Sequence, residues 1–419
     1  MIRVCNLYAP SHVLFDGMPS GRGLSFVGRV RSSEWDFFMP RRRRETSIVL
    51  TLALCAGLSV SPMRMAVHPT PASRPVDLVS IHMIDARVGW ALSTHAVLRT
   101  IDGGARWADV TPQGVTVAGS SGTAMAFLST RMGWVVVSHG GHMGIVIRTT
   151  DGGRTWRSTS IGFARPAIGV RQISFIDARH GWLLVTLTVT AGANSAVQIF
   201  RTSDGGTRWI SVSYTAVQRS SPGSLPYGGS KEGLGFRDPT TGFAGGRVNG
   251  PAGFVYLYVS HDGGATWRHQ GLTLPASYGT SYPTFAAPTF YTPVDGILPV
   301  TFAAAQLVYI THNGGRTWQA TRPLHGPVTL SFGDPQHGWA LGAGVLYTTR
   351  DEGRHWATMS SNIRFQQDTV LDPTGGAVAF ALRMTAAGGP TTVFRTTDGG
   401  RVWEARYPQV VLLPKIRTK

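Results

Sequence analysis

Short apolar runs alternate with turn-forming residues along most of the chain. Runs such as WALST (90–94), WVVVS (134–138) and WLLVTL (182–187) are followed by runs such as AVLRT (96–100) and IVIRT (145–149). Each run has the length and the β-branched or aromatic content of a strand, and Gly, Asp and Asn separate the runs. The pattern predicts an all-β protein of short antiparallel strands joined by tight turns.

One motif, [ST]-x-[DN]-x-G-x-x-W, occurs seven times between these strands. Its Asp or Asn side chain can accept bonds from the N–H groups that follow, its Gly suits a positive φ, and its Trp supplies a large ring for burial. The fourth residue is Gly in six copies and Glu352 in the other, which indicates a weaker constraint at that position. The third residues of the seven copies are Asp102, Asp151, Asp204, Asp262, Asn313, Asp351 and Asp398.

A second motif precedes each copy: an aromatic or aliphatic residue, any one residue, Asp, three further residues and Gly-Trp. It is clearest at Phe175–Trp182 and Phe332–Trp339, and looser at Asp295-Gly296 and Asp372…Gly376. Each unit then contains four strands, A to D, with turn chemistry between A and B and between C and D. Seven such units predict a seven-bladed β-propeller with four-stranded antiparallel blades. An open array of hairpins is the alternative, but it would expose the tryptophans.

The predicted propeller covers residues 76–410, followed by a basic tail at 411–419. Two segments compete for the seam of the ring. Asp77–Ile84 gives the first blade its own strand A, while Val410–Ile416 could add a strand there. The sequence leaves both arrangements open.

The N-terminal part has the layout of a secretory signal or a membrane anchor. Arg41–Arg44 precede the apolar run Ser47–Val60, which is shorter than the ~20 residues of a spanning helix. A buried core helix is the alternative, although no amphipathic helix follows for it to pack against. We expect an unstructured upstream extension at 1–38, the signal or anchor at 39–66 and a linker at 67–75. The propeller would then be extracytoplasmic, with a possible membrane association through the N-terminal segment.

The first motif is identified as the Asp-box, or bacterial neuraminidase repeat. Together with the second motif it resembles the photosystem II stability and assembly factor family over residues 76–405. That resemblance implies a lumenal or periplasmic seven-bladed propeller with a non-enzymatic, partner-binding role. Asp-boxes also occur in sialidases, xyloglucan hydrolases and sortilin-type receptors, so the shared motifs carry the fold and not a site.

The composition gives the chain a strong positive charge and argues against metal and cofactor sites. The chain has 39 Lys and Arg against 22 Asp and Glu, a net charge of +17. This favours an acidic partner, although the dominance of Arg over Lys also fits a compositional bias of the genome. Nucleic acid is not expected, because the single basic run, Arg41–Arg44, belongs to the signal. Cys5 and Cys55 precede the propeller, and His139-Gly140-Gly141-His142 lacks a third ligand, so we expect no metal and no cofactor.

Most carboxylates of the predicted propeller belong to the two turn motifs. Glu232 and Asp368 are the two that fall on loops able to line a pocket. A glycosidase needs two carboxylates, or the Tyr–Glu pair of sialidases, so we expect no enzyme. The alternatives are an exo-acting glycosidase of the sialidase type, with Glu232 beside Tyr227 in a central pocket, and a glycan-binding surface propeller. The arginines three residues before the box aspartates are interpreted as repeat features; they are Arg99, Arg148, Arg201 and Arg395.

Strand order predicts which face binds a partner. The boxes and A–B turns share one face, so the variable B–C and D–A loops share the other, including the D–A connections Arg157–Gln172, Ile210–Gly233 and Arg268–Pro288. His261 and His312 precede box residues and are interpreted as solvated turn positions. We expect a monomer that binds an acidic or membrane-proximal protein segment; an Arg-rich surface without a specific ligand is the alternative. The candidate binding residues are Arg165, Arg171, Arg219, Lys231, Arg247, Arg322, Arg364, Tyr227, Tyr278 and Tyr282.

Overall fold

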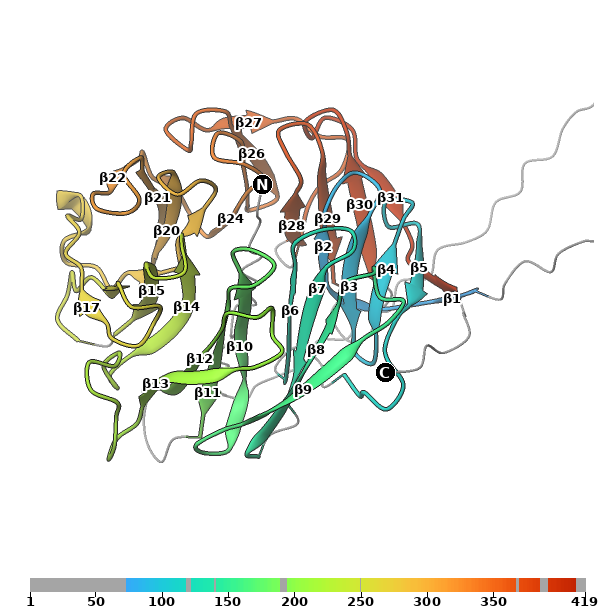
Figure 1. The fold of residues 1–419 in the computed structure, drawn as a ribbon. Helices are drawn as coiled ribbons and strands as arrows, with labels where there is room; N and C mark the ends of the chain where they lie inside the picture. The colour runs from blue at the N-terminus through green and yellow to red at the C-terminus, as the bar shows by residue number, and fades with distance from the viewer. Residues whose placement is uncertain are drawn as a thin grey trace, which may run out of the picture. The chain divides into compact units, whose positions relative to one another are not determined.

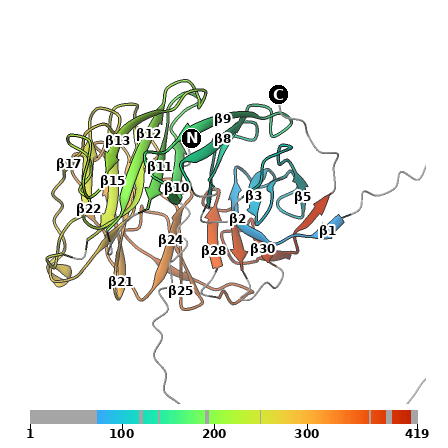
Figure 2. The ribbon, with the colours of Figure 1, turned by 90° about the horizontal axis from the view of Figure 1, so that it is seen from below.

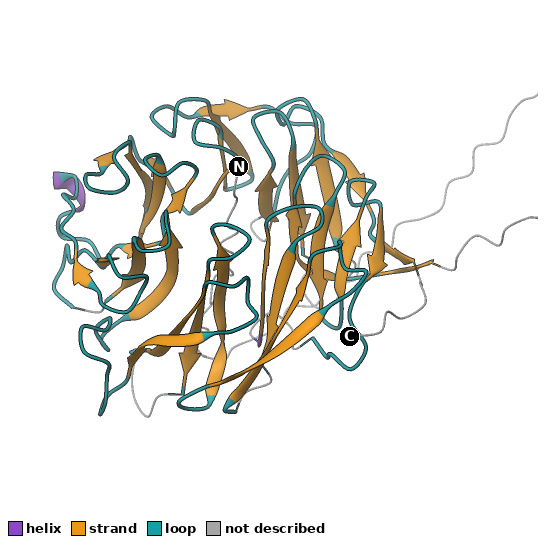
Figure 3. Ribbon diagram, in the orientation of Figure 1, coloured by secondary structure: helices purple, strands orange, loops and turns teal. Residues whose placement is uncertain are grey.

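Seven antiparallel sheets follow one another along the chain in a computed structural model (Figures 1 and 2). The structure describes residues 73–117, 122–138, 141–188, 194–248, 250–366, 369–384 and 391–411, all within one compact unit. The predicted extension and the signal or anchor segment therefore lie outside the described residues. Strands and loops dominate Figure 3, with one short 3-10 turn at Ala276–Tyr278. The predicted seven-bladed propeller is confirmed.

The first four blades have four strands each, in the order A to D. Blade 1 has β2 (Leu78–Met83), β3 (Gly89–Ser93), β4 (Val97–Thr100) and β5 (Arg106–Asp109), and blade 2 has β6 (Thr123–Phe127), β7 (Gly133–Val137), β8 (Met143–Thr149) and β9 (Arg157–Gly162). Blade 3 has β10 (Ala167–Phe175), β11 (Gly181–Leu187), β12 (Ala196–Thr202) and β13 (Ile210–Thr215). Blade 4 has β14 (Ser230–Phe236), β15 (Gly242–Arg247), β16 (Leu257–Ser260) and β17 (Arg268–His269).

Blade 5 is irregular, because its strands A and D are each split into two short pieces. Its strands are β18 (Thr284–Phe285) and β19 (Thr289–Phe290), β20 (Gly296–Phe302), β21 (Ala305–Thr311), and β22 (Gln319–Ala320) and β23 (Leu324–His325). Blades 6 and 7 are regular. They consist of β24 (Val328–Phe332), β25 (Gly338–Gly342), β26 (Val345–Thr349) and β27 (Ala357–Met359), and of β28 (Thr369–Pro373), β29 (Ala379–Arg383), β30 (Thr392–Thr396) and β31 (Glu404–Arg406).

Each pair of neighbouring blades buries its own apolar cluster. The Trp of the Gly-Trp motif stacks on a strand-A Phe of the next blade, as in Trp134 on Phe175 with ring centroids 3.6 Å apart. Blade 7 also packs on blade 1: Phe380 and Val393 share a buried cluster with Ile81 and Leu98. In Figure 1 the red strands of blade 7 accordingly lie beside the blue strands of blade 1. The blades therefore form one closed ring.

Both segments proposed for the seam are used there. Blade 1 has its own strand A, β2, and its outer strand β5 is extended by β32 (Gln409–Val411), which pairs with β5 in parallel. Outside β32 lies β1 (Ser73–Pro75), antiparallel to it, so part of the predicted linker belongs to the sheet. Val410 is buried in the cluster between blades 7 and 1. The seam is thus formed by strands from both ends of the described chain.

The same hydrogen bonds hold all seven boxes. In the first box, Thr100 Oγ1 donates to Asp102 Oδ1 at 2.9 Å and accepts from Gly104 N at 3.0 Å, while Arg106 N donates to Asp102 Oδ1 at 2.9 Å. Asn313 makes the equivalent bonds in blade 5 through its own Oδ1. The fourth residue of each box donates its N–H to a carbonyl of the A–B turn in the same blade. The box carboxylates are therefore occupied in holding turns together.

The fourth box position is more constrained than the sequence indicates. Its φ is positive in all seven copies, and Glu352 has a φ of 65° where the other boxes have Gly. A non-glycine residue in this region costs about 1–2 kcal/mol. Glu352 is therefore a strained substitution, and the prediction of a weaker constraint at this position is wrong.

Acid sensitivity should follow from the box carboxylates. Partial burial acts to raise the pKa of Asp351, but hydrogen bonds from His355 and Thr349 outweigh it and lower the pKa to about 2. Because the pKa of this carboxyl is about 4 in the unfolded chain and lower in the folded protein, its ionised form stabilises the fold above pH 4. This stabilisation is lost as the pH falls toward 2. The variant Asp351→Asn copies the Asn313 box of blade 5. We expect its free energy of unfolding at pH 7 to lie within about 1 kcal/mol of that of the wild type. Acid titration followed by circular dichroism should show a shallower loss of stability between pH 4 and 2; an unchanged acid slope would contradict this.

Candidate binding face

The loop face, formed by the B–C and D–A connections, lies at the opposite end of the strands from the boxes. Its connections are shorter than predicted, because strand D begins directly after each box in blades 2, 3 and 4. Arg157–Gly162 and Ile210–Thr215 are strands β9 and β13, and Arg268–His269 is β17. The actual D–A connections that remain are 163–166, 216–229 and 270–283.

Several candidate arginines are exposed on the loop face. Arg247 ends β15 in blade 4, and Arg322 lies between the two pieces of strand D in blade 5. Arg219 and Arg364 lie in the D–A connections after blades 3 and 6. Arg165 is half-buried in the connection after β9. The exposed arginines are thus spread over several blades and not gathered in one pocket. They are Arg219, Arg247, Arg322 and Arg364.

Lys231 does not lie on the accessible surface. It is 3% exposed on β14, the innermost strand of blade 4. Its Nζ donates to the carbonyls of Ser195, Tyr227 and Gly229 at 2.9–3.0 Å, with that of Gly228 at 3.3 Å. Burial lowers the pKa of Lys231 to about 7, while the ring of carbonyl oxygens favours the charged ammonium. Lys231 ties the loop at 194–195 to the loop at 227–229 and shapes the face from within.

The three candidate tyrosines differ in exposure. Tyr282 is 55% exposed and free to contact a partner. Tyr278 packs in the core between blades 4 and 5, stacked on Phe302 with centroids 4.4 Å apart. Tyr227 packs against the core between blades 2 and 3. Only Tyr282 is presented as an aromatic anchor.

Glu232 lies on the innermost strand of blade 4, not on the outer rim. Its carboxylate pairs with Arg171 of β10 and accepts a bond from the Ser230 hydroxyl at 2.7 Å. The two other described carboxylates at this end of the strands, Asp77 and Asp109, accept bonds from nearby backbone N–H groups. Asp368 lies outside the described residues. The described carboxylates of the loop face are thus already engaged, whereas its arginines are exposed.

The recurring arginines before the boxes connect neighbouring blades. Arg148 Nη1 donates to Gly205 O at 3.1 Å and Arg201 Nη1 to Asp262 O at 3.3 Å, each reaching the box of the next blade. Arg99 reaches the A–B turn of blade 2 at Thr130 O, and Arg395 packs beside Gly103 of blade 1. A guanidinium engaged in this way is not available to a substrate carboxylate. Sequence reasoning missed two arginines with the same role, Arg237 and Arg406, which bond to Gly314 O and Asp102 O.

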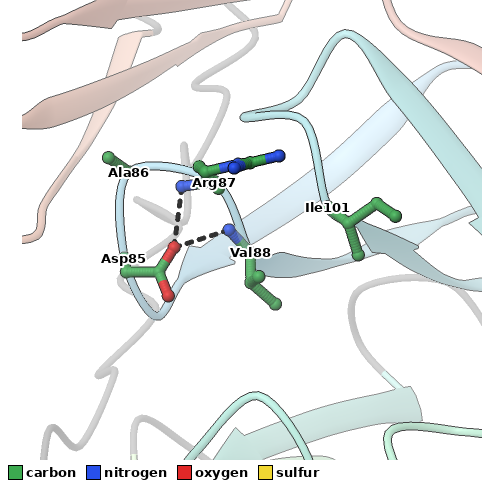
Figure 4. A pocket seen from close by; sticks show the side chains of 5 residues that line it. All are labelled: Asp85, Ala86, Arg87, Val88 and Ile101. Atoms are coloured by element: carbon green, nitrogen blue, oxygen red, sulfur yellow. Dashed lines mark hydrogen bonds between the residues drawn. The ribbon is translucent and has the colours of Figure 1, made fainter.

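Two cavities lie on the box face, in blade 1 and beside blade 6. One of about 530 Å³ is lined in blade 1 by Asp85–Val88 and Ile101 (Figure 4). Figure 4 shows the Asp85 carboxylate turned toward the N–H groups of Arg87 and Val88, both at 2.7 Å. That carboxylate holds the turn and has no second acid beside it in this cavity, so the cavity has the chemistry of a turn and not of an active site.

Metal ligation has no support among the described residues. Within those ranges, no group of three or more His, Cys, Asp or Glu side chains is placed to bind an ion. His142 Nδ1 contacts Phe163 O at 3.3 Å, and His139 lies outside the described residues. In the same part of the chain, no helix has the length and apolar character needed to cross a membrane.

Comparison with known proteins agrees with this architecture. A family profile described as BNR/Asp-box repeat matches residues 258–269, around the box of blade 4. A search of curated proteins gave no match. The fold is similar to the GH74 xyloglucanase from Xanthomonas campestris, with 15% identity and a TM-score of 0.52 over 80% of this chain and 55% of that chain.

Two YCF48 structures are also similar. YCF48 from Cyanidioschyzon merolae has 17% identity and a TM-score of 0.47 over 78% of this chain and 97% of that chain. YCF48 bound to a D1 peptide has 18% identity and a TM-score of 0.45 over 82% and 97%. At these identities the similarity concerns the fold alone. The chain is a seven-bladed β-propeller built from Asp-box repeats.

Proposed function

We propose that the chain is an exported, partner-binding propeller whose loop face docks an acidic segment of another protein. The observation that carries this is the charge balance of that face: Arg219, Arg247, Arg322 and Arg364 are exposed, while its described carboxylates are engaged. Uncompensated arginines on a rigid ring attract and orient an acidic chain. The role fits an assembly or stability factor, as the resemblance of the motifs implies. Export rests on the basic and apolar pattern of residues 39–66.

Binding rather than catalysis is the better fit to the inner end of blade 4. Glycoside hydrolysis needs a general acid and a second carboxylate or a tyrosine nucleophile. Glu232 is held by Arg171 and Ser230, which favours its ionised form and works against a role as a proton donor. Turnover of a fluorogenic sialoside or of xyloglucan that Glu232→Gln abolishes would contradict this assignment.

Charge reversal on the loop face should weaken binding of an acidic probe. The variant Arg247→Glu/Arg322→Glu/Arg364→Glu is expected to bind a fluorescein-labelled decaglutamate peptide at least ~10-fold more weakly, since each exposed pair contributes about 0.2–1 kcal/mol and reversal adds repulsion. Arg171 is left unchanged because it is engaged with Glu232. Fluorescence anisotropy at fixed ionic strength measures the change in Kd.

A matched control separates a specific face from general positive charge. The variant Arg208→Glu/Arg316→Glu/Arg401→Glu makes the same charge change at exposed positions of the boxes. We expect its Kd to stay within about two-fold of the wild type at moderate salt. Equal weakening by the two triple variants would mean that the arginines form a surface without a specific ligand.

A further inference from the structure

The interface between blades 5 and 6 has an aliphatic residue at the Gly-Trp position, where the interfaces on either side have an aromatic ring. Ile297 occupies the place of the Gly-Trp tryptophan in blade 5, whereas Phe243 in blade 4 stacks on Phe290 of blade 5. The fully buried apolar residues in the cluster between blades 5 and 6 are Ile297, Val308 and Ile310. By comparison, the cluster between blades 3 and 4 includes the stacked pair of Trp182 and Phe236.

The arginine that precedes the box in other blades and reaches the next blade is also missing from blade 5. Ile310 stands where Arg148 and Arg201 stand in blades 2 and 3, so blade 5 has no guanidinium at this position to reach the next box. In its place, the ring of His312 lies between two carboxylates. Its Nδ1 is 2.8 Å from Asp295 Oδ1 in its own blade, and its Nε2 is 3.4 Å from Glu352 Oε2 in blade 6.

Glu352 reaches His312 from the strained fourth position of the box in blade 6. Its side chain is 14% exposed, and Arg354 Nη1 lies 2.5 Å from the same carboxylate oxygen. A cavity of about 440 Å³ opens beside it, lined by Asp295 of blade 5 and by Glu352, Asp334 and His337 of blade 6. Glu352, which departs from the repeat, therefore makes a polar contact across this interface, beside the hydrogen bond from the Tyr291 hydroxyl to Phe332 O at 3.3 Å.

The two-sided contact depends on the protonation of one ring. A neutral imidazole has one N–H and one lone pair, so it can donate to only one carboxylate. The imidazolium donates from both nitrogens and is attracted to both acids. We propose that Asp295, His312 and Glu352 form a pH-sensitive clasp between blades 5 and 6, closed when His312 is charged and half released when it is neutral.

The charged groups around His312 come from blades 4, 5 and 6. A hydrogen bond from His312, together with one from Thr292, lowers the pKa of Asp295 and so favours the ionised form of this acid. Arg354 keeps Glu352 paired in its own blade. Across the cavity, Asp334 and His337 pair with each other, and from blade 4 Arg237 reaches Gly314 O beside His312. The clasp is tighter when the ring of His312 carries a second proton than when it is neutral, because only the imidazolium can donate to both acids.

Hydrogen exchange can localise the clasp. Amides of β20 and β24 in the whole protein should be about two- to five-fold more protected at pH 5.5 than at pH 8, after correction for intrinsic exchange rates. Glu352→Gly, which restores the residue of the other six boxes and removes the strain, should abolish this difference while the protein stays folded. Glu352→Gln should do the same without changing side-chain size.

The control is a histidine of the same box that bridges no blades. His355 pairs with Asp351 within blade 6, so His355→Gln should leave the pH difference in β20 and β24 intact. Amides of β11 and β14 at the interface of blades 3 and 4 serve as an internal reference. The proposal is overturned if Glu352→Gly and the wild type keep the same pH difference, or if His355→Gln removes it as completely as His312→Gln does.

Discussion

Trp182→Ala is expected to lower the free energy of unfolding by about 3–5 kcal/mol, which is the usual cost of deleting a large buried ring. Trp182 is 1% exposed, stacks on Phe236 of the next blade with centroids 3.7 Å apart, and donates from Nε1 to Gly263 O at 2.9 Å. The substitution leaves a cavity between blades 3 and 4 and an unpaired carbonyl in the box of blade 4. Urea unfolding at pH 7, followed by circular dichroism, measures the loss.

The blade 4 equivalent supplies the control for this variant. Phe243 occupies the tryptophan position there and stacks on Phe290 without an indole N–H. Trp182→Phe should therefore keep the stacked ring and lose mainly the hydrogen bond. We expect it to lower the free energy of unfolding by about 1–2 kcal/mol. If the alanine and phenylalanine variants lose equal stability, the stacked ring is not what joins these blades.

Removing β32 should destabilise the ring by about 3–5 kcal/mol, from the burial of one Val side chain and several backbone hydrogen bonds. Val410 is 4% exposed between blades 7 and 1, and β32 pairs with both β5 and β1. Truncation after Pro408 deletes β32 and leaves β1 without its partner. The midpoint of urea unfolding, with an unchanged m-value, reports the loss.

Truncation after Val411 is the matched comparison, because it removes the basic tail at 412–419 and keeps β32. We expect the free energy of unfolding of this shorter deletion to stay within about 1 kcal/mol of that of the full chain, because β32 keeps its pairing with β5 and β1. Equal stability of the two truncated proteins would show that β32 does not hold the seam.

The turn chemistry could be predicted from the sequence because it is local. The bonds made by the Thr100 and Asp102 side chains of the first box join residues at most four apart, as from Thr100 to Gly104 and from Asp102 to Arg106. The same holds for the positive φ of the box glycines. The repeat spacing then implied a ring, since seven amphipathic sheets bury their faces only against one another.

Contacts between distant segments could not be predicted in this way. The bond from Arg406 to Asp102 O joins the two ends of the ring and depends on how blade 7 meets blade 1. Lys231 was expected at the surface, and its burial follows from loops at 194–195 and 227–229 that close over it. His312 was interpreted as a solvated turn residue, because nothing in its own segment indicates that Asp295 and Glu352 converge on it.

The seam also has a consequence for biosynthesis. Because the outer edge of blade 1 is completed by β32, the first blade to leave the ribosome stays unfinished until the last strand has been made. During that interval the apolar side of blade 1 that faces blade 7 has no neighbour, and the nascent chain exposes it to solvent or to a chaperone. Ring closure therefore waits until Gln409–Val411 have been made and reach back to the beginning of the fold.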